Sequence, residues 1–422
     1  MLGTEREKVL QLRLFKREDY LRKIRGFYHD EGMIKVITGV RRCGKSCLMQ
    51  TIARELVDGG ADPASVVYLD LDSRGLRSVK SADALERAID EASAAAPNGT
   101  RYLFIDEVQN VKGYEEVVNA FRNDGGWSVF VTGSNGYLLS GELMTKLTGR
   151  YVEFEVQTLT FAEYEAMKAF LGKPVNPNPV AEFDSYILEG GFPKALEYDS
   201  LTDKRAYVKS VVAEILEKDV RRRVQVRNMS VFERVRTYIT NNFGATTSLA
   251  NIRADLVGPG IDVKLETVAR YVKILEDAKV VRRCDRFDMK SRKSLRGEQK
   301  YYLADLGFYF AANTDNRINY GPVLENIVYN YALSKGYEVS VGRIGKLECD
   351  FVMRSPEMDY AYVQVALTIM LSRETEDREY RPLEQIRDNY PKYVVTRSDV
   401  IQRRGGIKHV NALEFMLEGG LF

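Results

Sequence analysis

One segment of the chain, Gly39 to Ser46 (GVRRCGKS), has the residue types that bind phosphate. It fits the pattern G-x-x-x-x-G-K-[ST], in which glycines allow a tight loop whose backbone N–H groups face an anion. In such a loop the lysine reaches the β- and γ-phosphates of a nucleotide, and the hydroxyl ligates Mg²⁺. We therefore predict a site for ATP and Mg²⁺ formed by Gly39, Val40, Arg41, Arg42, Cys43, Gly44, Lys45, Ser46 and Cys47.

The segments on either side of this loop have the patterns that a phosphate site requires. Residues Met33 to Thr38 are mostly apolar and β-branched, as in a buried strand. The residues that follow the loop carry Leu48, Ile52 and Leu56 at helical spacing. A strand, a glycine loop and a helix in this order place the positive end of the helix at the anion. A glycine turn that matches the pattern by chance is the alternative, and both flanks disfavour it.

A second motif, which ends in two acidic residues, follows about 60 residues after the phosphate loop, in Arg101 to Glu107 (RYLFIDE). A buried strand that ends in Asp-Glu is what a Walker B element requires. Asp106 is predicted to hold Mg²⁺ through its water shell, and Glu107 to polarise the attacking water. An acidic strand end at the surface is the alternative, and the phosphate loop upstream favours the catalytic interpretation.

Polar residues near the ends of two further strands could complete this site. Ser134 and Asn135 follow a strand over Trp127 to Thr132, so either side chain could position the water; a plain Gly/Asn turn is the alternative. Arg150 could stabilise transition-state charge in its own subunit or in a neighbour's. A surface arginine at the start of a strand fits the sequence equally well.

The elements that must position these residues alternate between strands and helices. Such alternation predicts an α/β fold: a P-loop NTPase core with a parallel sheet and helices on both faces, over residues 1–158. Ligands bind at the carboxyl ends of the strands in such sheets, and Lys45, Asp106 and Asn135 all follow strands directly.

The composition limits the other classes of function. The 422 residues have a net charge of +2, so any affinity for nucleic acid must come from a local basic surface. Two histidines and four cysteines without a C-x-x-C pair argue against zinc chemistry and against Ser-His or Cys-His catalysis. The charged N-terminus lacks the apolar core of a signal peptide, and no apolar run approaches ~18 residues. We therefore expect a cytoplasmic protein with reduced thiols and no membrane partner.

Downstream of the core, residues 159–228 are mainly helical and predict a lid or connector. Residues 229–312 then read as helix, helix, turn, helix and β-hairpin, the order of a winged helix-turn-helix. From Lys279 to Lys300 there are nine Lys or Arg and three Asp or Glu, a local charge that can grip phosphates. Double-stranded DNA is the expected ligand, and a winged helix used for protein contacts is the alternative. The candidate nucleic-acid contacts are Lys264, Arg270, Lys273, Lys290, Arg292 and Lys293.

The last predicted unit covers residues 313–422. It contains a helix over Pro322 to Ser334, three strands, a charged helix over Glu374 to Arg387, and a last strand over Lys392 to Thr396.

The chain resembles a large prokaryotic family of AAA-type P-loop ATPases with a C-terminal domain of unknown function. The resemblance covers nearly the whole chain in the family's order. Its carriers are GVRRCGKS, RYLFIDEVQN, VFVTGSN, LTGRYVEFEVQTLTFAEY, EGGFPKAL, KYYLADLGF, LENIVYNYAL and ECDFV. Members of this family look like relatives of the archaeal-type ATPases, with a winged helix after the ATPase core. Their last domain is similar to the PD-(D/E)xK nuclease fold.

That resemblance implies a nuclease constellation which this chain only partly retains. It maps the carboxylates to Glu325 and Asp350, and a further acid and a lysine to the next strand, where Gln364 and Ala366 stand. Glutamine still offers a carbonyl to a metal, whereas alanine offers nothing. We therefore expect a restriction-endonuclease-like α/β domain without robust nuclease activity.

The leading hypothesis is an ATP-binding, Mg²⁺-dependent ATPase, with Lys45, Glu107, Asn135 and Arg150 at the reacting centre. Its nucleotide state would control the winged helix and the last domain, which act on nucleic acid or on a protein partner. The alternative is a DNA-binding regulatory or interaction protein with slow or vestigial hydrolysis. An ATP-switched nuclease and a small-molecule P-loop kinase are the lesser alternatives, and the sequence leaves a homo-oligomer open.

Overall fold

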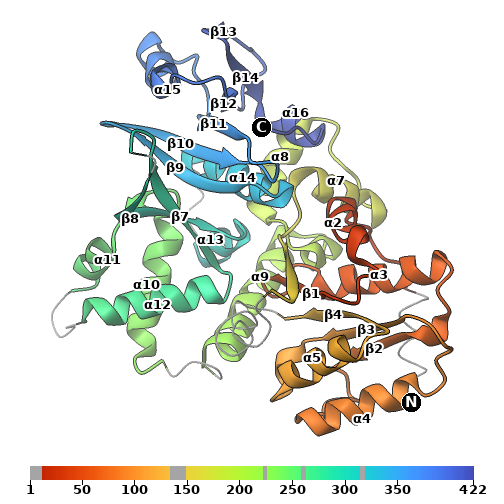
Figure 1. Ribbon diagram of the computed structural model, residues 1–422. Coiled ribbons are helices and arrows are strands. Elements are labelled where there is room, and N and C mark those ends of the chain that lie inside the picture. The colour runs from red at the N-terminus through yellow and green to blue at the C-terminus, as the bar shows by residue number, and fades with distance from the viewer. Residues whose placement is uncertain (1–11, 134–148, 222–225, 258–262, 292, 314–318) are drawn as a thin grey trace. The chain divides into compact units, whose positions relative to one another are not determined.

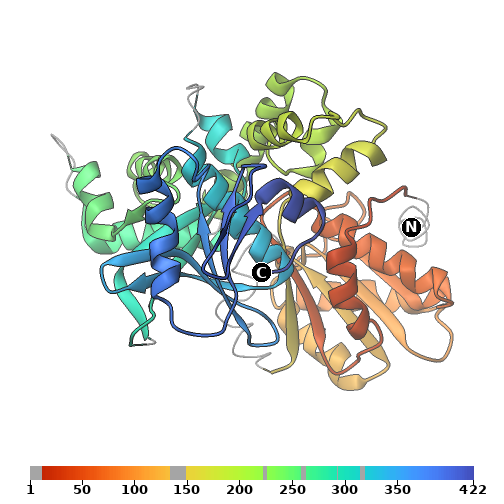
Figure 2. The same cartoon turned by 90° about the horizontal axis from the view of Figure 1, so that it is seen from above.

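The computed structural model describes residues 12–133, 149–221, 226–257, 263–291, 293–313 and 319–422. The chain forms two compact units, Met1–Val156 and Gln157–Phe422. The first runs from red to yellow and the second from yellow to blue (Figure 1 and Figure 2). The predicted core boundary, residue 158, lies close to the junction of the two units.

The first unit alternates strands and helices after a short helical start. Its described elements are α2 (Glu18–Ile24), η1 (Arg25–Phe27), β1 (Ile34–Gly39), α3 (Lys45–Asp58), η2 (Pro63–Ser65), β2 (Val66–Asp70), α4 (Ala82–Ser93), β3 (Arg101–Asp106), η3 (Val108–Asn110), α5 (Tyr114–Asp124), β4 (Trp127–Thr132) and β5 (Tyr151–Val156). The predicted strands all form, within a residue or two at their ends. Ser81 caps α4 by accepting a hydrogen bond from the Ala84 N–H, as its position before the helix predicts.

The five strands of this unit form one parallel sheet in the order β2-β3-β4-β1-β5. One face carries aliphatic side chains that form a buried cluster with α4 and α5. The other face carries stacked rings: the centroid of Phe104 lies 6.0 Å from that of Tyr68 and 4.7 Å from that of Phe130. The helix α3 covers that second face (Figure 1). The predicted α/β core with a parallel sheet is therefore confirmed.

The second unit begins with helices and continues into a mixed sheet. Its described elements are α7 (Phe161–Phe170), α8 (Pro179–Glu189), η5 (Pro193–Glu197), α9 (Leu201–Ile215), the π-helical turn η6 (Leu216–Arg221), α10 (Met229–Asn241), β6 (Thr246–Thr247), α11 (Leu249–Leu256), α12 (Leu265–Asp277), β7 (Val281–Asp288), β8 (Lys293–Leu303), α13 (Gly307–Ala312), α14 (Tyr320–Lys335), β9 (Glu338–Ile344), β10 (Leu347–Arg354), β11 (Tyr360–Val365), α15 (Arg373–Gln385), β12 (Lys392–Thr396), β13 (Arg403–Arg404), β14 (Ile407–Asn411) and α16 (Ala412–Leu417). The prediction that β12 is the last strand is wrong. Three more elements, β13, β14 and α16, follow it. Each is too short for a strand or helix period to be recognised in the sequence.

The strands of this unit form a single nine-stranded sheet in the order β13-β14-β12-β11-β10-β9-β7-β8-β6. The hairpin β7–β8 joins the C-terminal strands through a parallel pairing of β7 with β9. The predicted boundary at residues 312 and 313 lies at the end of α13, between strands β8 and β9 that belong to the same sheet. Helices α14 and α15 pack on opposite faces of the C-terminal strands, as the contacts of Phe351 with Tyr329 and of Val352 with the α15 cluster show.

None of the helices in the described part of the chain is long and apolar enough to cross a membrane.

Candidate functional site

The phosphate loop joins β1 to α3 through backbone conformations that its glycines permit. Gly39 has φ +144° and Gly44 has φ +106°. A Cβ atom at position 39 would lie 2.3 Å from the Val156 carbonyl oxygen, so only glycine fits there. Arg42 also adopts a left-handed conformation, with φ 68°. The loop needs these turns because the chain must reverse direction between the strand and the first turn of the helix.

Lys45 is the first residue of α3 and lies inside this loop. Its Nζ donates hydrogen bonds to the carbonyl oxygens of Gly39, at 3.1 Å, and Val40, at 3.2 Å. The side chain is buried, and so are those of Val40, Arg41 and Cys43, whereas Arg42 and Cys47 are exposed. The ammonium group is thus held where the loop wraps around the N-terminus of the helix, the position from which a lysine binds phosphate oxygens.

Asp106, at the end of β3, is the centre of a buried hydrogen-bond network. Its Oδ1 accepts a hydrogen bond from the Thr132 hydroxyl, and the Tyr68 hydroxyl lies 3.4 Å from its Oδ2. The Ser46 hydroxyl also hydrogen-bonds to the Asp106 carboxylate. The structure therefore brings together the two predicted Mg²⁺ ligands, Ser46 and Asp106, although they lie in different parts of the sequence.

The environment of Asp106 also changes its acidity. The pKa of Asp106 is raised to about 6, chiefly by burial and in part by the neighbouring Glu107, although the hydrogen bonds from Thr132 and Ser46 lower it. Across the residues that the structure describes, Asp106 forms no ion pair, and a buried carboxylate of this kind is a strong ligand for a hard cation. The donor set of one hydroxyl and one carboxylate oxygen fits Mg²⁺, which keeps several waters and takes one or two protein ligands.

Glu107 follows directly in a left-handed conformation with φ 56°. Its N–H donates to the Thr132 hydroxyl at 3.0 Å, and its Oε2 accepts a hydrogen bond from the Gln109 side chain. The same Thr132 hydroxyl thus donates to Asp106 and accepts from Glu107, which fixes the angle between the two acids. A non-glycine residue in this region of φ is strained and persists only where the surroundings hold it.

Sequence reasoning missed Thr132. Because β4 lies between β1 and β3, its last residue stands between the phosphate loop and the acidic pair. A hydroxyl at the end of that strand was the available signal, but strand order cannot be read from one sequence. The predicted residues just beyond it, Ser134 and Asn135, lie outside the described residues.

The prediction that Arg150 completes the site of its own subunit is wrong. Its carbonyl oxygen accepts the Ile34 N–H at 2.9 Å, and its Nη1 lies 3.5 Å from Asn119 Oδ1. Arg150 therefore lies at the amino ends of β1 and β5, whereas the phosphate loop follows the carboxyl end of β1. Six strand residues separate the two edges by ~20 Å. A role in a neighbour's site stays a prediction.

The candidate nucleic-acid residues lie on two elements of the second unit. Arg270 and Lys273 are exposed on α12, Lys264 is exposed just before it, and Lys290 and Lys293 are exposed on the hairpin. Lys273 forms an ion pair with Asp277 at 2.8 Å, so its charge is partly compensated. Arg292 lies outside the described residues.

The predicted degenerate nuclease residues do come together, but around a lysine that the sequence did not suggest. Lys300, on β8, places its Nζ 3.1 Å from Glu325 Oε2 and 3.7 Å from Asp350 Oδ1. Glu348 also lies 3.1 Å from the same nitrogen. Gln364 is bound to protein groups, because its Oε1 accepts the Asp350 N–H at 3.3 Å and its Nε2 donates to Glu379 at 2.9 Å.

An ammonium group therefore lies among the carboxylates that the resemblance assigned to a metal. Burial raises the pKa of Asp350 well above its usual range, with a further contribution from Glu325, while Lys300 opposes the shift. Burial by itself lowers the pKa of Lys300, but the nearby carboxylates of Asp350, Glu325 and Glu348 outweigh that effect and raise it above its ordinary value. Within the described ranges, no group of three or more His, Cys, Asp or Glu residues is arranged to hold a metal ion. In the structure Glu325, Glu348 and Asp350 are thus engaged with Lys300.

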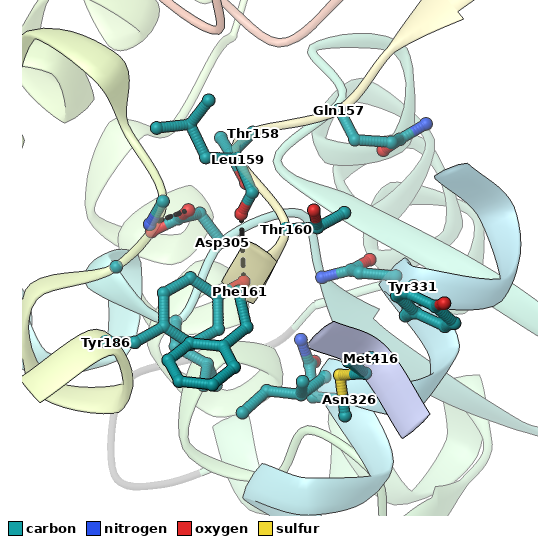
Figure 3. A pocket seen from close by; sticks show the side chains of 15 residues that line it. Gln157, Thr158, Leu159, Thr160, Phe161, Tyr186, Asp305, Asn326, Tyr331 and Met416 are labelled. Atoms are coloured by element: carbon teal, nitrogen blue, oxygen red, sulfur yellow. Dashed lines mark hydrogen bonds between the residues drawn. The ribbon is translucent and has the colours of Figure 1, made fainter. Parts of the chain in front are cut away.

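Three motifs of the resemblance, LTGRYVEFEVQTLTFAEY, EGGFPKAL and KYYLADLGF, meet around one buried acid, Asp305 (Figure 3). Its carboxylate accepts the N–H groups of Gly191, at 2.8 Å, and Gly307, at 2.7 Å. A Cβ atom at Gly190 would lie 2.2 Å from Asp305 Oδ1, which explains the paired glycines of EGGF. The cavity beside it has a volume of about 20 Å³, room for about one water molecule. This cluster holds segments far apart in the sequence and offers no room for a substrate.

Comparison with known proteins gives two family models that match parts of the chain. An AAA domain matches residues 31–165, which include the phosphate loop, Asp106 and Glu107. A domain of unknown function (DUF8612) matches residues 180–317.

Similar proteins come from both bacteria and archaea. An "Uncharacterized protein" of Haemophilus influenzae is 30% identical over 407 residues, which cover 96% of this chain and 99% of that protein. "Uncharacterized protein MJ1544" of Methanocaldococcus jannaschii is 29% identical over 315 residues, 72% of this chain and 67% of that protein. The solved structure of the Aeropyrum pernix ORC2 protein is 12% identical with a TM-score of 0.39, and the match covers 78% of this chain and 94% of that one.

Proposed function

The chain belongs to the family of its Haemophilus influenzae relative and carries an AAA-type P-loop core, and on that premise we propose that it binds ATP with Mg²⁺ and hydrolyses it. The nucleotide state then controls the C-terminal module, which acts on nucleic acid or on a protein partner. The observation that carries this proposal is the network that joins Ser46, Asp106, Thr132 and Glu107 at one edge of the sheet, beside Lys45.

Each residue of this network has a chemical role in the proposal. Lys45 and the loop N–H groups bind the phosphates, and the ammonium moves from the loop carbonyls to the phosphate oxygens. Ser46 and Asp106 would hold Mg²⁺, which when bound supplies positive charge to the β- and γ-phosphate oxygens. Glu107, whose backbone is fixed by Thr132, polarises the water that attacks the γ-phosphorus.

The domain plan that goes with this function has four parts: the ATPase core over 1–158, a helical connector over 159–228, a winged helix-turn-helix over 229–312, and a nuclease-like domain over 313–422. The order α10, β6, α11, α12, β7, β8 supports the winged helix, because the short strand β6 pairs with β8 beside the hairpin. Lys300 among the carboxylates disfavours the ATP-switched nuclease.

The experiment that tests the ATPase is a comparison of wild type with Lys45→Ala and Lys209→Ala. We expect Lys45→Ala to lose ATP binding, measured with a fluorescent nucleotide, and to lose phosphate release with it. Lys209→Ala removes an exposed lysine of α9 outside the site and should match wild type. Equal ATP affinity and equal turnover in Lys45→Ala and wild type would overturn the proposal.

A second function, a DNA-binding regulator with slow hydrolysis, is favoured by one observation. Arg270 is exposed on α12 with Lys264 exposed just before it, and Lys290 and Lys293 are exposed on the hairpin, so both elements that a winged helix lays on duplex DNA carry exposed cations. Phosphate release measured with and without duplex DNA distinguishes the two. Stimulation by DNA joins the ATPase to the winged helix, and indifference with salt-dependent DNA binding favours the regulator. Indifference without DNA binding points to a protein partner, and light scattering of the same samples reports any homo-oligomer.

A further inference from the structure

The tip of the hairpin β7–β8 lies beside a second turn that belongs to the C-terminal strands. β7 and β9 run in parallel, with Asp288 in register with Arg343, and the Met289 N–H donates to the Arg343 carbonyl oxygen at 3.0 Å. Parallel strands end at the same edge of a sheet, so the turn after β7 and the β9–β10 turn lie next to each other. The sequence places these turns more than fifty residues apart and gave no hint that they meet.

Four exposed cations gather at this edge: Lys290 and Lys293 on the hairpin, and Arg343 and Lys346 at the β9–β10 turn. Across the described residues, none of these four side chains forms an ion pair. The carboxylate in register with them, Asp288, accepts the backbone N–H groups of Lys290, at 2.8 Å, and Ser291, at 3.2 Å. These N–H groups hold the pKa of Asp288 below its usual value, so it stays ionised and offsets one of the four charges.

The other acids of the two hairpins are already compensated. Glu298 lies 2.9 Å from Arg286, and Glu348 lies 3.1 Å from Lys300. Asp285 pairs with Arg283 at 2.9 Å. Because these acids are paired, the four exposed cations dominate the electrostatic potential at this edge of the sheet and make it positive. Solvent and dissolved anions can reach them there.

We propose that Arg343 and Lys346 extend the basic surface of the hairpin, and that this turn-and-hairpin surface (Lys290, Lys293, Arg343, Lys346) binds the phosphate backbone of duplex DNA. The inference rests on the DNA-binding function proposed above and adds the C-terminal domain to the contact. Exposed lysines and an arginine without carboxylate partners complement a ligand with one negative charge per ~1.7 Å of its axis. Contacts of this kind fix a protein on the duplex without reading its sequence.

The test is duplex binding by the full chain, measured by fluorescence anisotropy over a series of salt concentrations. We expect Arg343→Gln/Lys346→Gln to weaken binding about tenfold at moderate salt and to reduce the slope of log affinity against log salt by about 2, one for each lost phosphate contact. The hairpin variant Lys290→Gln/Lys293→Gln should have a similar effect. Arg381→Gln/Arg387→Gln removes two exposed arginines from another part of the same unit and should leave both quantities unchanged.

Two failures are distinguishable. If wild type binds no duplex at low salt, the DNA-binding function and this inference both fall. If wild type binds and the hairpin variant is impaired, but Arg343→Gln/Lys346→Gln matches the control, the function stands and the turn-and-hairpin surface is overturned. Binding of wild type to vesicles of anionic phospholipid, abolished by the same variants and without duplex binding, would overturn it in favour of a membrane surface.

A second measurement needs no variant. Chemical acetylation of wild type in the presence of duplex should leave Lys290, Lys293 and Lys346 protected and Lys408 modified as in free protein. Equal modification of Lys346 with and without a saturating duplex would contradict the proposal.

Discussion

The Nζ of Lys300, on β8, lies 3.7 Å from Oδ1 of Asp350, on β10. The two residues come from regions that the sequence assigned to different domains, and one continuous sheet brings them together. Only 6% of the lysine side chain is exposed, so its charge depends on the carboxylates around it. An internal cation thus lies among the acids that the resemblance assigns to a nuclease site.

Replacement of Lys300 by methionine should therefore destabilise the second unit. The change leaves the buried Asp350 and the partly buried Glu325 without their cation, whereas Glu348 keeps Arg286, and we expect a loss of about 3–5 kcal/mol in the free energy of unfolding. Urea denaturation measures it. Lys346→Met, at an exposed lysine, should change the same free energy by less than ~0.5 kcal/mol. An equally small effect in both variants would show that Lys300 is not essential to the cluster.

The same cluster predicts that the protein does not cleave DNA. We expect no cleavage of linear or supercoiled duplex by wild type with Mg²⁺ or Mn²⁺, with or without ATP, because the acids bind Lys300. Electrophoresis of the treated DNA reports cleavage. Metal-dependent cuts that disappear in Asp350→Asn would refute this interpretation and restore the ATP-switched nuclease.

The buried Asp106 predicts how Mg²⁺ binding depends on pH. Burial raises its pKa to about 6, above the ordinary value, so the free protein takes up a proton as the pH falls through 6. Mg²⁺ must displace that proton, and its apparent affinity in the presence of ATP should fall about tenfold for each pH unit below 6. Titration of Mg²⁺ at several pH values measures this dependence. Asp106→Asn reports the pH dependence of Mg²⁺ affinity that comes from the nucleotide's own phosphates. If Mg²⁺ affinity depended on pH in the same way in both proteins, Asp106 would not be the group that titrates.

Thr132 should matter for turnover more than for ATP binding. Thr132→Val keeps the shape of the side chain and removes both the donor to Asp106 and the acceptor for the Glu107 N–H. Loss of these bonds, at about 1–1.5 kcal/mol, slows phosphate release by roughly tenfold. Thr240→Val, at a buried threonine in α10, is the control. Wild-type turnover in Thr132→Val would mean that the two acids need no support from β4.

Arg150 gives a prediction that separates a subunit from an assembly. Because Arg150 lies at the opposite edge of the sheet from its own phosphate loop, Arg150→Ala should leave turnover unchanged in dilute monomer. If copies of the chain complete each other's sites, wild-type turnover per subunit rises with protein concentration and that of Arg150→Ala does not. Phosphate release measured over a range of concentrations decides between these outcomes. A large loss in monomer would contradict the geometry.

The sequence predicted this core better than it predicted the last domain, for physical reasons. The strands β1 and β3 are short apolar runs bounded by glycine or acidic residues, so their ends and the residues at them can be read locally. Thr132 and Lys300 act through strand order and sheet continuity, which depend on residues far apart in the chain. The sequence correctly predicted that Arg150 precedes a strand. It did not show that the start of this strand lies at the edge of the sheet opposite the phosphate loop, because that depends on how the strands pair.

The central claim is ATP hydrolysis at the edge of the sheet where Lys45, Asp106 and Glu107 meet, and phosphate release by Glu107→Gln tests it most directly. The account predicts that this variant binds ATP with wild-type affinity and releases phosphate at least ~100-fold more slowly, because glutamine cannot polarise the attacking water as a carboxylate does. Equal rates of phosphate release in wild type and Glu107→Gln would contradict it.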